Sequence, residues 1–187
     1  VLFAGCLGIA GWLCYRGTHT VPERTDAEGL APGQVEARLI EREGQPWVQI
    51  SSRIDAPIAQ VWKVVHDHER MTEFMPRMAK LRILEPGEEH RRVRIDFRFL
   101  FLDQHTQIDV TCEVLPDRRV EEWSQFEGSL TRNHGRWLLV PIGDGATFAR
   151  YEVDVDSGLP VPGWLERALM LEALPVVLTR VKERIDR

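Results

Sequence analysis

The chain has 187 residues, of which 43% are hydrophobic and 28% charged, a composition typical of one soluble globular domain with a sizeable core. Its net charge of -5 arises from lysines and arginines scattered among acidic residues, so the sequence has no basic stripe and nucleic acid is excluded as an expected partner. Two of the three cysteines, Cys6 and Cys14, lie in an apolar N-terminal stretch, and Cys112 stands alone in the rest, so no disulfide framework is predicted.

The first 15 residues, VLFAGCLGIAGWLCY, are apolar and are followed by a polar stretch. The segment is shorter than the roughly 20 residues that span a bilayer, and we interpret it as a signal-peptide core or a membrane anchor, with a buried helix as the alternative. A membrane-anchored or exported protein is therefore expected, with a membrane as partner of this segment and the soluble domain outside the bilayer. Residues 16–34 lack an apolar period and predict a linker, so the folded domain is expected over residues 35–187.

Residues 35–54 alternate between polar and apolar side chains and predict one long strand or a hairpin around Gly44. A helix is expected next, because Pro57 suits the first helical position. The apolar residues that follow recur at the spacing of one helix face: Ile58, Val61, Trp62 and Val65.

A second short helix is predicted over HERMTEFMPRM, where Met71, Phe74 and Met75 precede Pro76. His66 and His68 stand two positions apart at the end of the first helix, where their side chains are expected to point in different directions toward solvent. No metal site is predicted from them.

Residues 78–156 form a series of apolar-alternating segments separated by turn signals, which predicts an antiparallel meander. One face of it is expected to be dry, and three segments contribute to that face: Val93, Ile95, Phe97, Phe99 and Phe101; Ile108, Val110, Cys112 and Val114; Ala149, Tyr151, Val153 and Val155. The segment VEEWSQFEG is ambiguous, because either Glu122 and Ser124 or Glu121, Trp123 and Gln125 could point inward.

The chain ends in a helix of about 25 residues whose apolar side chains cover more than one stripe and which Pro175 should bend. These elements predict an α+β fold in which a curved antiparallel sheet of about seven strands wraps around the long C-terminal helix, with two short helices after the first strand.

This order of elements resembles the START-like, polyketide cyclase/dehydrase and lipid transport superfamily (SRPBCC, the helix-grip fold), and within it the chain is similar to coenzyme Q-binding START-like proteins. The resemblance rests on IDAP followed by VW in the first helix, on ERMTEFMP, on HGRWLLVPIGDGATFARYEVDVD and on PVPGWLERAL.

The resemblance implies a hydrophobic cavity between the sheet and the last helix that holds a lipid, quinone or polyketide-like molecule. Because the dry-face residues predicted above include no carboxylate, histidine or lysine, we expect binding or transport of this molecule without catalysis or a cofactor. The resemblance leaves open, as the alternative, a cyclase, aromatase-like or hydrolase-like enzyme in the same cavity. The residues expected to line the cavity are Trp62, Met71, Phe74, Met75, Phe97, Phe99, Phe101, Trp123, Tyr151, Leu165 and Leu169.

The residues alone supply little for catalysis. Glu122, if it points inward, and the Tyr151 hydroxyl are weak acid/base candidates, and Cys112 on a dry strand face is expected to be a small core residue. The sequence contains none of the GxSxG, HExxH, P-loop or GxGxxG motifs, which excludes the common hydrolase, nucleotide and dinucleotide classes.

Overall fold

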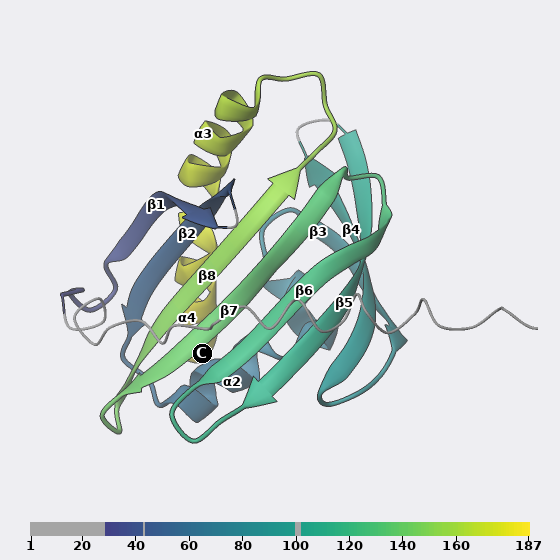
Figure 1. Ribbon diagram of the computed structural model, residues 1–187. Helices are drawn as coiled ribbons and strands as arrows, with labels where there is room; N and C mark the ends of the chain where they lie inside the picture. The colour runs from purple at the N-terminus through teal and green to yellow at the C-terminus, as the bar shows by residue number, and fades with distance from the viewer. Residues whose placement is uncertain (1–28, 43, 100–101) are drawn as a thin grey trace, which may run out of the picture.

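The computed structural model describes residues 29–42, 44–99 and 102–187. In this part of the chain one antiparallel sheet of eight strands has the order β1-β2-β8-β7-β6-β5-β4-β3 (Figure 1). The strands are β1 (Val35–Arg42), β2 (Gln45–Ile54), β3 (Met78–Glu85), β4 (His90–Phe99), β5 (Leu102–Val114), β6 (Arg119–Gly128), β7 (Arg132–Ile142) and β8 (Ala146–Asp156). Strand β8 returns to pair with β2, so the hairpin β1–β2 extends one end of a meander that runs from β3 to β8.

The strand count exceeds the predicted seven because residues 35–54 form a hairpin rather than one strand. Gly44 in its turn has a φ of 73°, in the left-handed region that glycine adopts without steric cost. Val35 therefore pairs with Ser52, and Arg42 with Gln45.

Within the described residues, four helical segments accompany the sheet. The short helices α2 (Ile58–Val65) and η1 (His68–Glu73, a 3-10 helix) lie between β2 and β3, as predicted, and α3 (Gly163–Ala173) and α4 (Pro175–Ile185) follow β8. The predicted long helix is thus divided at Leu174. Pro175 has no amide hydrogen to donate to the preceding turn, and it occupies the first turn of α4, where that donor is not needed.

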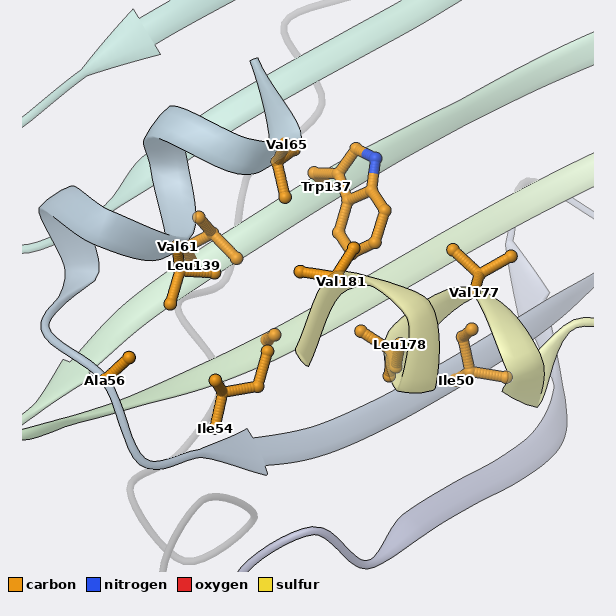
Figure 2. Packing of buried hydrophobic residues seen from close by; sticks show 11 residues of the cluster. Ile50, Ile54, Ala56, Val61, Val65, Trp137, Leu139, Val177, Leu178 and Val181 are labelled. Atoms are coloured by element: carbon orange, nitrogen blue, oxygen red, sulfur yellow. The ribbon is translucent and has the colours of Figure 1, made fainter. Parts of the chain in front are cut away.

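The sheet curves around α4 and α2, which pack against its concave face (Figure 1). Figure 2 shows the buried contact: Val61 and Val65 of α2 lie beside Leu178 and Val181 of α4, over side chains of β2 and β7. The cluster consists of Ile50, Ile54, Ala56, Val61, Val65, Trp137, Leu139, Ala149, Val177, Leu178 and Val181. The cavity lies on the same concave face, between strands β4 to β8 and the helical segments η1, α3 and α4.

A second buried cluster, Val93, Ile108, Val110 and Cys112, confirms the dry face predicted for β4 and β5. Val114 does not follow this pattern and is 61% exposed, because it is the last residue of β5 and lies beyond the cluster. Phe101 and the side chain of Phe99 lie outside the described residues.

Residues 29–34, which the sequence places in a linker, contact the sheet. Leu30 is buried against Phe148 of β8, and Pro32 forms a bridge with Arg53 of β2. The predicted signal or anchor segment, residues 1–15, and the rest of the predicted linker up to residue 28 lie outside the described residues. Among the described helices, none is long and apolar enough to cross a bilayer.

Candidate functional site

Two connected chambers lie between the concave face of the sheet and the helices. The outer chamber, of about 500 Å³, is lined by strands β4, β5, β7 and β8, by the segment Met75–Met78 and by helices α3 and α4. The inner chamber, of about 100 Å³, lies deeper between η1 and strands β4 to β8. The two share the side chains of Met75, Met78, Ile95, Asn133 and Tyr151. Exposed residues such as Leu169 and Arg77 belong to the outer wall, so the outer chamber reaches the protein surface.

The structure brings six of the predicted ligand-binding residues to these chambers. Met71 and Trp123 line the inner chamber, Phe97 and Leu169 the outer chamber, and Met75 and Tyr151 both. The other three described residues lie elsewhere. Trp62 stacks on His66, Phe74 lines surface grooves beside Arg184, and Leu165 is half-buried on α3 outside both chambers.

Strand β6 points Glu121 and Trp123 toward the inner chamber. Because side chains alternate along a strand, Glu122 lies on the opposite face, where its register partner is Arg136. The hypothesis that Glu122 is an acid/base group of the cavity is therefore wrong, and the carboxylate that reaches the cavity is the neighbouring Glu121.

Glu121 belongs to a closed ring of hydrogen bonds with His66, His68 and Arg91. Its Oε2 lies 3.0 Å from His66 Nδ1, and its Oε1 lies 3.0 Å from His68 Nε2. The other nitrogens of the two imidazoles face Arg91: His68 Nδ1 lies 3.0 Å from Nη1, and His66 Nε2 lies 2.5 Å from Nη2. His68, Arg91 and Glu121 are buried, and His68 and Glu121 line the inner chamber.

The electrostatics of this ring follow from burial and pairing. Burial by itself raises the pKa of Glu121, but the hydrogen bonds that His66 and His68 make to the carboxylate outweigh it and lower that pKa to about 2. The thiol of Cys112, 3.5 Å from Glu121 Oε2, has its pKa raised by burial and by the charge of Glu121. Glu121 is therefore ionised at neutral pH, whereas Cys112 is a thiol and is not activated as a nucleophile.

Sequence reasoning missed this ring because it expected His66 and His68 to diverge at a solvated helix end. The chain instead leaves the helical conformation between them: Asp67 has φ -80° and ψ 73°, and its side chain accepts a hydrogen bond from the amide of Arg70 at the start of η1. This break turns both imidazoles toward Glu121. A signal was present in the sequence, since Arg91 shares the strand parity of Val93 and so belongs to the dry face.

The donors of a metal site are also present: His66 Nδ1, Cys112 Sγ and a Glu121 oxygen lie within 4.8 Å of one another. Zinc accepts all three ligand types. Arg91, however, can only donate, so it requires an unprotonated Nε2 on His66 and places the proton on Nδ1, the atom that a metal would need. The observed arrangement thus fits a hydrogen-bonded ring rather than a metal centre.

Tyr151 lies where the two chambers meet, its ring packed against Trp123 and Trp137 at centroid distances of 5.4 and 4.7 Å. Burial raises the pKa of its hydroxyl, which stays protonated at neutral pH. Within the described part of the chain the hydroxyl has no hydrogen-bond partner, whereas the nearby Trp123 Nε1 donates to Asn133 at 3.1 Å. The Tyr151 hydroxyl is thus a polar group available to a molecule in the cavity.

A curved antiparallel sheet that grips C-terminal helices around an apolar cavity defines the helix-grip class of ligand-binding folds, as the sequence predicted. Residues 54–182 match the family model described as polyketide cyclase / dehydrase and lipid transport. The chain belongs to this family. No curated protein sequence matched it.

Solved structures agree on the fold. The chain is similar to a STAR-related lipid transfer protein from Xanthomonas axonopodis, with a TM-score of 0.71 and 18% identity over 82% of this chain and 94% of that one. The Zhui aromatase/cyclase from Streptomyces sp. R1128 gives a TM-score of 0.66 at 20% identity, over 75% of this chain and 93% of that one. Human STARD10 gives a TM-score of 0.68 at 11% identity, over 90% of this chain and 82% of that one. Both lipid transfer proteins and a cyclase therefore share this architecture.

Proposed function

We propose that the protein binds and carries a hydrophobic small molecule, such as a lipid, quinone or polyketide-like compound, without catalysis. The observation that carries this proposal is the cavity itself. The outer chamber alone, of about 500 Å³, lies within the range of roughly 300–1,000 Å³ typical of small-molecule sites. Its walls are mainly apolar, and Met75, Met78 and Met170 give it side chains that adapt to the shape of a ligand.

The wall of the inner chamber also favours binding over chemistry. The titratable groups that line it are His68, Glu121 and Tyr151. His68 is hydrogen-bonded to Glu121 and Arg91, Glu121 is hydrogen-bonded to His66 and His68, and burial keeps the Tyr151 hydroxyl protonated by raising its pKa. A general base needs a free acceptor site directed at the substrate. In this ring, hydrogen bonds between the four residues occupy the acceptor sites of His68 and Glu121 that face the chamber.

Native mass spectrometry of the full chain, purified from a membrane-containing lysate without detergent, tests the proposal. We expect one co-purifying hydrophobic molecule per chain, which organic extraction then identifies. A mass that stays that of the bare chain, before and after incubation with lipids, quinones and sterols, would contradict it.

A matched pair of variants shows whether the molecule sits in the cavity. Ala173 on α3 lines the outer chamber, whereas Ala168 on the same helix is exposed and lies outside it. Ala173→Phe is expected to fill part of the chamber and to lose most of the bound molecule, and Ala168→Phe to keep it. Equal occupancy in the two variants would place the molecule elsewhere.

A cyclase-like or hydrolase-like enzyme is the second candidate, favoured by one observation: Glu121, a carboxylate, reaches the inner chamber. An aromatic ketone bound in deuterated water would then exchange its α-hydrogens in the wild type but not in Glu121→Gln. Binding of the ketone without exchange would leave the carrier function as the better account.

The apolar segment of residues 1–15 adds a further proposal, that the protein is membrane-anchored or exported. Cell fractionation with an alkaline wash of the membranes tests it. A retained anchor leaves the protein in the washed pellet, a cleaved signal leaves it shortened in the soluble exported fraction, and full-length protein in the cytosolic fraction would contradict both.

A further inference from the structure

We infer that the ring of His66, His68, Arg91 and Glu121 is an acid-sensitive clamp that holds η1 over the cavity, so that acid accelerates exchange of the bound molecule. This inference rests on the proposed function, of which it describes the regulation. The ring joins the end of α2 and the start of η1 to strands β4 and β6, and it borders the inner chamber.

The proton positions in the ring follow from what each group can do. Arg91 only donates, so His68 Nδ1 and His66 Nε2 both accept from it. Glu121 is ionised and only accepts, so His68 Nε2–H and His66 Nδ1–H both donate to it. Each imidazole therefore carries one proton and is neutral. The charges of Arg91 and Glu121 balance, and all four hydrogen bonds are satisfied.

One added proton breaks this arrangement. A protonated His68 or His66 presents an N–H group to an N–H group of Arg91, at the 3.0 or 2.5 Å that now separates acceptor from donor. The cluster also gains a net positive charge in a buried place, which costs free energy. Among the described residues, the other titratable group against the rings is Cys112, which is 3.6 Å from His66 Nδ1 and is a neutral thiol. It supplies no compensating charge, so the link to Arg91 opens.

The clamp holds the part of the chain that covers the inner chamber. Met71 and Met75, which follow His68 in sequence, line that chamber. Among the described residues, the other tertiary ion pair of this segment joins Glu73 to Arg184 of α4; it lies nearer the surface, where solvent screens it. Loss of the buried ring would therefore let residues 66–75 move away from β4 and β6 and open the chamber.

The first test measures release of a neutral hydrophobic probe, N-phenyl-1-naphthylamine, whose own charge stays constant across the titration range of histidine, about pH 8 to 5. For the full-length wild type we expect the dissociation rate to rise at least about tenfold between about pH 7.5 and 5.5, since a buried hydrogen bond to a charged group is lost. In the double variant His66→Gln/His68→Gln, glutamine can accept from Arg91 and donate to Glu121 but cannot take up the proton. Its rate should be independent of pH.

His90→Gln is the matched control, because His90 precedes Arg91 on β4 but its half-exposed side chain lies on the other face of the sheet, where it contacts Asp109 of β5. It should keep the acid acceleration of the wild type. Acceleration that persists in the double variant, or that vanishes in His90→Gln, would overturn the clamp.

The second test needs neither a variant nor a probe. Amide hydrogen exchange of the wild type at the two pH values, corrected for the intrinsic pH dependence of exchange, should show protection of residues 66–75 falling about tenfold in acid relative to β8. Unchanged relative protection would overturn the clamp even if the probe binds. Lost protection together with no probe binding at either pH would support the clamp and count against the carrier function.

Discussion

Arg91 of β4 and Glu121 of β6, both buried on the concave face, are joined through His66 and His68 rather than to each other. Two neutral imidazoles thus connect the two opposite charges. The price of burying these charges is offset by four hydrogen bonds, and removal of one partner leaves the others uncompensated.

The stability of the protein should therefore depend on the charge of Glu121. Its pKa is about 2 in the folded chain, against about 4.3 for an unperturbed glutamate, so the folded state binds fewer protons in this window. The stabilisation is fully present above the unfolded pKa and is lost as pH falls from about 5 toward 2. Urea unfolding at pH 7 should show Glu121→Gln to be destabilised by roughly 3 kcal/mol, with a shallower acid dependence than the wild type. Glu127→Gln, an exposed glutamate on the same strand, should change the free energy of unfolding by less than about 0.5 kcal/mol.

The planar guanidinium of Arg91, which donates to both histidines, should also not be replaceable by the ammonium group of a lysine. Arg91→Lys keeps the charge, but a lysine ammonium cannot donate to His66 and His68 in the same geometry, so we expect a loss of roughly 1–3 kcal/mol in thermal or urea unfolding. The adjacent Arg92, whose side chain is 41% exposed and pairs with Asp109, is the control. Arg92→Lys should cost less than about 1 kcal/mol, and equal losses for the two variants would count against the ring.

The sequence allowed prediction of the curved sheet, the two short helices and the C-terminal helical region, because apolar periodicity follows directly from which face is buried. The sequence could not show which side chains of β6 face the cavity, since both faces of that strand carry a glutamate. The ring was missed for a related reason: a single backbone break at Asp67 sets the directions of His66 and His68, and helical spacing does not describe that break. Contacts between four separate elements are set by tertiary packing, which local pattern does not encode.

The thiol of Cys112 should react slowly with alkylating reagents. Burial and the charge of Glu121 raise its pKa, so the thiolate needed for alkylation is scarce at pH 8. In a chain whose Cys6 and Cys14 are replaced by serine, modification by iodoacetamide should be slower than that of a free thiol by at least about a hundredfold, and should become normal in urea. Fast modification of the folded protein would show that the thiol is exposed or activated.

The Tyr151 hydroxyl should contribute little to folding because the described residues leave it without a partner. Tyr151→Phe should change the free energy of unfolding of the ligand-free protein by less than about 0.5 kcal/mol. Tyr151→Ala removes the ring that packs against Trp123 and Trp137 and should cost roughly 3–5 kcal/mol. A large loss of unfolding free energy in Tyr151→Phe would mean that the hydroxyl is hydrogen-bonded within the protein.

The position of Trp123 in the inner chamber depends on a glycine across the sheet. Gly135 of β7 is its register partner, and a Cβ atom at Gly135 would come within 2.1 Å of the Trp123 ring and 2.7 Å of the Glu152 carbonyl oxygen. Because neither the ring nor the backbone can withdraw without repacking, Gly135→Ala should cost roughly 1–3 kcal/mol in urea unfolding and push Trp123 into the chamber. Probe binding should weaken accordingly. Gly145, where an added Cβ meets nothing within 4 Å, is the matched control, and Gly145→Ala should leave stability and binding close to those of the wild type. If Gly135→Ala were equally neutral, the tight packing of Trp123 on β7 would not be what shapes the chamber.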